Sequence, residues 1–217
     1  MIWLSVAFAA GAVALAVRWW ATRVDALGRA KPFPFISVGL LGLLAAVVVI
    51  PGYLRHREET SLSAVATTLV GASATVRCQS FGQELVDLGS ELGYVRYGAD
   101  GVPEHRTLIK RGPCKALNAY KRSDKRHPTD DEVVAVHVLT HEAMHMRGVT
   151  VEAAAECAAV QRDELTARLL GADDAEAREL ARRYWLLDYP RMPDDYRSSD
   201  CAPGAPMDEH LASAAWS

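Results

Sequence analysis

Two long stretches without a charged side chain most constrain how this chain can fold. Residues 1–17 carry no charge, and residues 33–54 form a second uncharged run that is rich in leucine and valine. At about 1.5 Å per helical residue, each run is long enough to cross the hydrocarbon core of a bilayer as a helix. We therefore expect two transmembrane helices, at about residues 1–17 and 35–54, and a membrane anchor over residues 1–54.

The charges around the two runs set their expected orientation. The connecting loop carries four basic residues: Arg18, Arg23, Arg29 and Lys31. Only Arg55 and Arg57 closely follow the second run. Because basic loops are retained in the cytoplasm, residues 55–217 are expected outside it. A cleaved signal peptide is the alternative for the first run, but that run lacks a basic start and a second apolar run follows it.

The cysteines support this location. All four lie in the expected exterior part: Cys78, Cys114, Cys157 and Cys201. Disulfides persist in oxidising compartments, and four cysteines allow three pairings. We expect Cys78–Cys114 and Cys157–Cys201, because each pair brackets one half of the domain. Four buried free thiols are the alternative, and the absence of a C-x-x-C spacing argues against a metal role for them.

Composition and charge exclude two classes of protein. Half of the residues are hydrophobic and 24% are charged, which is not the composition of a disordered chain. The net charge of -3 offers no basic surface, so we expect no nucleic-acid partner. A lipid bilayer is an expected partner, and the sequence leaves the oligomeric state open. The excess of arginine over lysine, 19 to 5, is associated with GC-rich bacteria.

The exterior part predicts a mainly helical α+β fold with one β-hairpin. Residues 94–97 and 106–109 flank a turn-rich loop, which indicates two strands. Before them, residues 60–73 indicate a weak amphipathic helix or a stalk. Pro51 followed by Gly52 is expected to end the second membrane helix.

Three further helices are expected after the hairpin. The first begins at Thr129, which fits a capping box with Glu132, and ends at Gly148. The second is expected over residues 151–170, and the third over residues 173–188. The rest of the chain is rich in Pro, Gly, Ser and Asp, which predicts irregular structure.

His141, Glu142 and His145 form an H-E-x-x-H motif inside the first of these helices. Residues four apart lie one turn above each other, so both imidazoles can bind one zinc ion. Glu142 is rotated by about 100° from His141 and can act as the general base on the water that zinc polarises. The motif therefore predicts zinc-dependent hydrolysis of a peptide bond. An ion-paired helix face without a metal is the alternative.

A zinc site of this kind needs a third protein ligand. Metzincin-type enzymes place a third His where this chain has Val151, which excludes that class. Over residues 141–160 the chain resembles gluzincin-type metallopeptidases, which include membrane prenyl-protein proteases, phage-repressor-cleaving peptidases and penicillin-sensor peptidases. Their second helix carries E-x-x-A-D/N-x-x-A or a close variant, and this chain reads EAAAECAA from Glu152. The resemblance implies that Glu152 is the third ligand and that Glu156 supports a ligand histidine.

The spacing departs from that of the resembling families, because Glu152 follows His145 by only seven residues. A tight turn over residues 147–150 would still give an antiparallel helix pair. That pair would set Glu152 opposite His145 and Glu156 opposite His141. The same geometry leaves Glu156 as an alternative ligand.

Other residue types suited to catalysis have weaker support. His137 lies one turn before His141, either as a supporting residue of the site or as a core histidine. Side chains that can stabilise an oxyanion, none of them assigned, are His105, His127, His210, Tyr94, Tyr97, Tyr184, Tyr189 and Tyr196.

These features predict a membrane-anchored zinc metallopeptidase, a hydrolase with a zincin-like domain over residues 55–217. Its substrate would be a protein or peptide outside the cytoplasm, and its location the cell membrane, with two spans. The alternative is a catalytically inactive zincin-like or disulfide-braced ectodomain that acts as a binding or sensing module.

Overall fold

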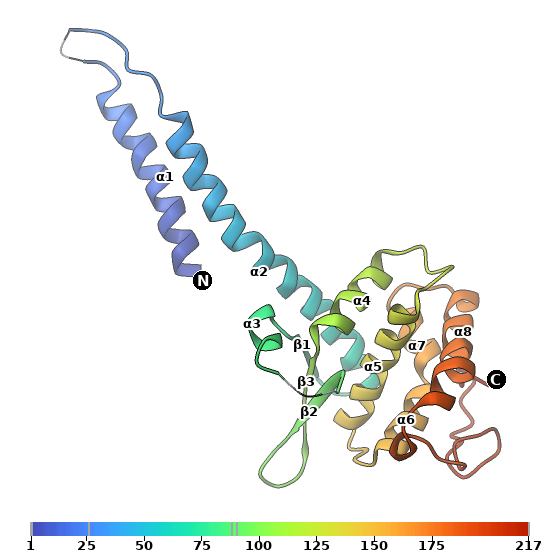
Figure 1. The fold of residues 1–217 in the computed structure, drawn as a ribbon. Coiled ribbons are helices and arrows are strands. Elements are labelled where there is room, and N and C mark those ends of the chain that lie inside the picture. Colours follow the sequence, from blue (N-terminus) through green and yellow to red (C-terminus); the bar gives the residue numbers. More distant parts are fainter. Residues whose placement is uncertain (1, 26, 88, 90, 217) are drawn as a thin grey trace. The chain divides into compact units, whose positions relative to one another are not determined.

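The chain divides into two compact units, Met1–Arg57 and Glu58–Ser217 (Figure 1). The computed structural model describes residues 2–25, 27–87, 89 and 91–216. Helix α1 (Ile2–Thr22) and the first part of helix α2 (Phe35–Val70) belong to the first unit. Both helices are long and apolar enough to cross a membrane. The first position of the expected span over residues 1–17 lies outside the described residues.

Helix α2 does not end at Pro51 and Gly52, so that expectation is wrong. The helix continues to Val70 and includes the segment expected as a weak helix or stalk. A proline inside a helix removes one hydrogen bond and crowds the carbonyl four residues earlier, but tertiary packing can outweigh that cost. Here the later turns bury one apolar face in the core of the second unit: Leu62, Val65, Ala66 and Leu69.

A small sheet forms one side of the second unit. Among the described residues its strands are β1 (Thr75–Cys78), β2 (Gly93–Tyr97) and β3 (Pro103–Ile109), in the order β1-β3-β2. Strands β2 and β3 are antiparallel and form the expected hairpin. Strand β1 pairs in parallel with β3 and was not expected. Strand β1 has only four residues, which is too few to distinguish an alternation of apolar and polar side chains from chance.

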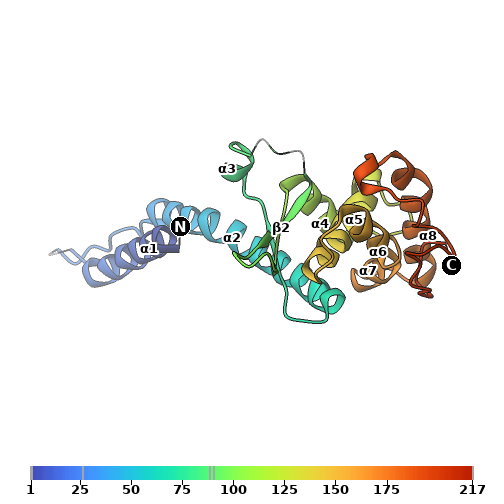
Figure 2. The ribbon, with the colours of Figure 1, turned by 90° about the horizontal axis from the view of Figure 1, so that it is seen from below.

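The rest of the second unit is helical, which gives a mainly helical α+β fold. The elements are α3 (Phe81–Glu84), α4 (Arg111–Arg122), α5 (Asp130–Met146), α6 (Glu152–Val160), α7 (Asp163–Leu169), α8 (Asp174–Arg183), a π-helical turn (Tyr184–Asp188) and two 3₁₀ turns (Tyr189–Arg191 and Asp194–Tyr196). Helix α5 contacts β2 and β3 as well as α4, α6 and α7. Figure 2 shows α5 with the sheet on one side and with α6 and α7 on the other.

Helix α5 begins and ends as its sequence indicates. Thr129 caps it, because the Thr129 hydroxyl accepts from the Glu132 N–H while the Glu132 carboxylate accepts from the Thr129 N–H. The chain leaves the helix through Gly148, whose φ of 101° is in the left-handed region that glycine adopts without strain. Almost every side chain between these two ends is buried, so α5 is the central helix of the unit.

The helix expected over residues 151–170 is interrupted, so that expectation is wrong. Helix α6 ends at Val160 and α7 begins at Asp163. The intervening Gln161 donates to the Met207 carbonyl at 3.0 Å and accepts from the Glu209 N–H at 2.7 Å. Arg162 forms a two-pronged ion pair with Glu209, and these distant partners fix the break in the helix.

Two disulfides brace the second unit, and their pairing is the one expected. Cys78–Cys114 joins β1 to α4. Cys157–Cys201 joins α6 to the irregular segment that follows the 3₁₀ turns. The second bridge therefore fastens residues near Tyr196 to the helix that carries Glu152 and Glu156.

Candidate metal centre

Three side-chain atoms converge where α5 meets the start of α6. Nε2 of His141 lies 2.9 Å from Nε2 of His145, and Oε2 of Glu152 lies 3.2 Å from each of them. The two histidines share a face of α5, one turn apart, and Glu152 is the first residue of α6. The short turn between the helices brings the carboxylate to the histidines, as the spacing predicted.

The hydrogen-bond partners of the two Nδ1 atoms indicate which nitrogen of each imidazole carries the proton. Nδ1 of His145 lies 2.7 Å from the Val149 carbonyl oxygen, and Nδ1 of His141 lies 3.0 Å from Oε2 of Glu156. Both partners accept hydrogen bonds, so we assign the proton to Nδ1 in each ring. A neutral imidazole protonated at Nδ1 has a lone pair on Nε2. Both Nε2 lone pairs therefore face one point beside the Glu152 carboxylate.

This donor set fits a metal cation. Three electron-rich atoms at 2.9–3.2 Å repel one another unless a positive charge lies between them. A tetrahedral ion with bonds of about 2.0–2.1 Å holds its ligand atoms about 3.3 Å apart, close to these separations. His141, His145 and Glu152 can therefore hold a metal ion, and two imidazoles with one carboxylate suit zinc and several other divalent transition metals.

The carboxylates give this point a preference for positive charge even without a metal. Burial lowers the pKa of His141, but its hydrogen bonds to Glu152 and Glu156 outweigh burial and raise the pKa to about 9. The hydrogen bond from His141 in turn holds the pKa of Glu152 below its usual range. The metal-free site therefore takes up a proton, and metal binding releases it.

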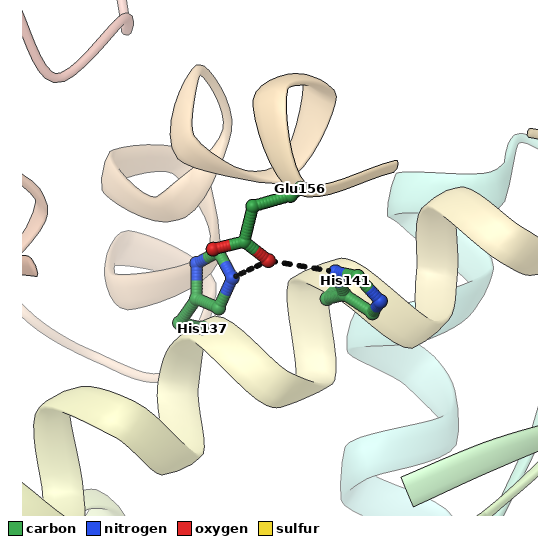
Figure 3. A group of neighbouring side chains, drawn as sticks. All are labelled: His137, His141 and Glu156. Atoms are coloured by element: carbon green, nitrogen blue, oxygen red, sulfur yellow. Dashed lines mark hydrogen bonds and ion pairs between the residues drawn. The ribbon is translucent and has the colours of Figure 1, made fainter. Parts of the chain in front are cut away.

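A second His/His/Glu group lies one turn further along α5. His137, His141 and Glu156 also come close enough to hold an ion, and Figure 3 shows Glu156 reaching from α6 to both rings. Here the carboxylate is already satisfied, because Oε2 accepts from both imidazoles at 3.0 Å and Oε1 accepts from the Tyr184 hydroxyl at 2.7 Å. Burial raises the pKa of Glu156, but His137 and His141 outweigh it and hold the pKa well below its usual range. Hydrogen bonds thus account for this group without a metal ion.

Glu142 lies on the neighbouring face of α5, next to the sheet and within electrostatic range of His141 and Glu152. Its carboxylate is buried and accepts a hydrogen bond from the Thr107 hydroxyl at 3.1 Å. Gly93 makes room for it, because a Cβ atom at this position would lie 2.8 Å from Oε1 of Glu142. Burial raises the pKa of Glu142 to about 7, although the charge of His141 and the Thr107 hydrogen bond oppose the rise.

Two tyrosines lie near the converging atoms. The ring of Tyr196 stacks on His141, with centroids 5.8 Å apart. Burial, and then the charges of Glu152, Asp195, Glu142 and Glu156, raise the pKa of Tyr196 to about 12. The pKa of Tyr97, at the end of β2, is raised by burial and then by Glu152 and Glu142.

The remaining unassigned candidates have other partners or none at the site. Tyr184 bonds to Glu156, Tyr189 donates to the Ser198 carbonyl and His210 pairs with Asp208. Among the described residues, no contact places His105, His127 or the side chain of Tyr94 at the converging atoms.

Three residues that shape the site had no signal in the sequence, namely Gly93, Thr107 and Asp163, and Tyr184 was a candidate whose contact with Glu156 was not expected. Each of these four residues lies at least 26 residues from its partner, and none belongs to a motif of fixed spacing. No protein-family model, curated protein or solved structure matches the chain.

Proposed function

We propose that this chain is a membrane-anchored, zinc-dependent metallopeptidase that hydrolyses peptide bonds of a protein or peptide outside the cytoplasm. One observation carries the proposal. The lone pairs of His141 and His145 converge with Glu152 at one point, and the buried carboxylate of Glu142 lies on the next residue of the same helix. Two helices of membrane-spanning length and two disulfides support the proposed location.

In this proposal His141, His145 and Glu152 are the metal ligands, and Glu156 orients His141. A zinc ion held by these residues would supply Lewis-acid chemistry, polarising a substrate carbonyl and lowering the pKa of a bound water molecule. A set of three protein ligands would have the ligand count of a catalytic rather than a structural zinc site.

Glu142 is the general base of the proposed reaction. A base works best when its pKa is close to the working pH, and burial brings the pKa of Glu142 to about 7. The Thr107 hydroxyl and the missing side chain of Gly93 together fix where its carboxylate lies. Glu142 accepts the proton of the attacking water and returns it to the leaving amine.

The side of the site next to the sheet suits an extended peptide. Strand β2 is at the edge of the sheet and contacts α5, so a peptide can pair with it beside Glu142. The Tyr196 phenol, which stacks on His141 and remains protonated with its pKa of about 12, is the proposed hydrogen-bond donor to the oxyanion that forms during hydrolysis.

The test uses the full-length chain in lipid nanodiscs. We expect about one zinc ion per chain by elemental analysis, and cleavage of members of a peptide library by mass spectrometry. Glu142→Gln should retain the metal and lower the rate by about 10²–10⁴-fold, the usual contribution of a general base. Glu164→Gln alters another buried glutamate, paired with Arg168, and should leave both readouts near the wild-type values.

The outcomes distinguish the two functions that the chain can serve. Hydrolysis by Glu142→Gln at the wild-type rate would contradict the proposed mechanism. Bound metal without hydrolysis of any library member would favour an inactive zincin-like module that binds or senses a ligand. A reporter fused after Ser217 tests the location, and cytoplasmic activity of that reporter would contradict it.

A further inference from the structure

The carboxylate of Glu156 is itself held by a second buried pair. Nε2 of His137 lies 3.0 Å from Oε2 of Glu156, and Nδ1 of His137 lies 2.8 Å from Oδ2 of Asp163. A continuous line of hydrogen bonds thus runs from Asp163 through His137 and Glu156 to Nδ1 of His141. It links α7, α5 and α6 and ends on the ring whose Nε2 faces the metal position.

The His137 ring has one orientation available to it. Tyr184 stacks on it with centroids 3.6 Å apart and an interplanar angle of 9°, while its hydroxyl donates to the other oxygen of Glu156. Both ring nitrogens of His137 face carboxylate oxygens, so both act as donors. Ring rotation would break both hydrogen bonds and the stacking together.

Asp163 is an unusual residue for a purely structural contact. It is completely buried, and its Oδ1 has no hydrogen-bond partner within the described part of the chain. Leaving such an atom without a partner destabilises the fold, so burying an aspartate here is unfavourable for stability alone. The interruption between α6 and α7 is what makes Asp163 the first residue of α7, where its side chain reaches His137.

We propose that Asp163 and His137 are positioning residues of the metal centre, which act through Glu156 to fix the orientation and tautomer of His141. This inference rests on the proposed metal site, because it assigns these residues a function only if His141 is a ligand. Outer partners of ligand histidines raise ligand basicity and fix the ring plane, and their loss weakens metal binding. Here the same effect is transmitted through two further side chains.

The competing explanation is that the line merely joins three helices. The same helices offer a control, because Thr140 of α5 donates to Thr166 of α7 at 2.8 Å. This pair is as buried as His137 and Asp163, lies three residues further along each helix, and has no link to Glu156. If the line of hydrogen bonds serves only helix packing, a substitution in either pair should have the same effect on zinc affinity. If it positions His141, only a substitution in the His137–Asp163 pair should weaken zinc binding.

The experiment measures metal affinity in the full-length protein in nanodiscs. Asp163→Asn keeps the size of the side chain and removes its charge, and Thr166→Val is the control. Zinc affinity is measured by chelator competition, and the visible spectrum of the cobalt-substituted protein reports the ligand geometry. We expect Asp163→Asn to weaken zinc binding by about tenfold, the lower end of the usual outer-partner effect, and to shift the cobalt bands.

Thr166→Val should lower the thermal midpoint but leave zinc affinity and the cobalt spectrum unchanged. If Asp163→Asn does not fold, as judged by circular dichroism, His137→Gln provides the same two readouts. Equal zinc affinities and spectra for the wild type and the folded variant would overturn the inference while leaving the proposed function intact. A wild-type chain that binds no zinc would overturn both, whereas zinc binding without hydrolysis would affect the proposed function only.

Discussion

Two buried glutamates, one on each of two sides of helix α5, have pKa values shifted in opposite directions. On the side of α6, Glu156 is 1% exposed and receives hydrogen bonds from two imidazoles and a phenol, and its pKa is well below the usual range. On the side of the sheet, Glu142 is 4% exposed and accepts one hydrogen bond, from the Thr107 hydroxyl, and its pKa rises to about 7. Burial is nearly the same on both sides, so the number and charge of the partners decide the direction of each shift.

Under the proposed function, this difference separates two tasks that a hydrolytic metal site must combine. Ligand histidines need a fixed orientation, which many hydrogen bonds provide. A general base needs a carboxylate that readily takes and gives up a proton, which many hydrogen bonds would prevent. We therefore expect substitutions on the two sides of α5 to change stability in opposite directions.

The largest effect is expected for Glu156→Gln. Removing one charge from a buried, hydrogen-bonded group should lower the free energy of unfolding of the metal-free chain by about 3 kcal/mol at pH 8. A lowered pKa stabilises the fold above the unfolded value of 4.5, so this loss should shrink as the pH falls below that value. Guanidinium unfolding, followed by tryptophan fluorescence, measures it. An unchanged unfolding midpoint at pH 8 would show that the interactions of His137 and His141 with the Glu156 charge do not stabilise the fold.

The opposite sign is expected for Glu142→Gln, with a smaller magnitude. A raised pKa means that Glu142 favours the fold while protonated, and that this contribution is lost as the pH rises from 4.5 through about 7. The neutral glutamine should therefore stabilise the metal-free chain by about 2 kcal/mol at pH 8 and have little effect at pH 4.5. The same unfolding experiment at the two pH values measures the difference. A destabilised variant at pH 8 would mean that the Glu142 carboxylate has stronger partners than the Thr107 hydroxyl.

The smallest effect is expected for Gly93→Ala. The added Cβ would meet Glu142 at 2.8–3.0 Å, so the carboxylate must move. We expect the rate of peptide hydrolysis to fall by about tenfold, because small displacements of a catalytic group are costly, while the metal content stays at the wild-type level. Gly112→Ala is the control, since nothing lies within 4 Å of its added Cβ. Loss of metal in Gly93→Ala would show that the two sides of α5 are not independent.

The parts of the fold that were predicted correctly depend on local chemistry. The capping box at Thr129 and Glu132, the stop at Gly148 and the hairpin all follow from residues within a few positions of one another. The convergence of His141, His145 and Glu152 also follows from helical spacing and one short turn.

The parts that were missed depend on distant partners. The break after Val160 is stabilised by hydrogen bonds between Gln161 and residues more than forty positions away. No local sequence pattern predicts these hydrogen bonds. The continuation of α2 past Pro51 depends on a core assembled from the rest of the unit. Asp163 lies directly after that break, so its contact with His137 could not be identified before the fold was known, although His137 itself was a candidate.

The disulfide between Cys157 and Cys201 has a consequence for the order of biosynthesis. Cys157 directly follows Glu156, and its partner lies 44 residues later in the chain. The ribosome must therefore finish the segment that carries Tyr196 before oxidation can fasten that segment to α6. A nascent chain that has emerged only as far as Glu152 has the three candidate ligands but lacks this brace. The bridge can therefore form only after both helices of the candidate metal centre have been synthesised.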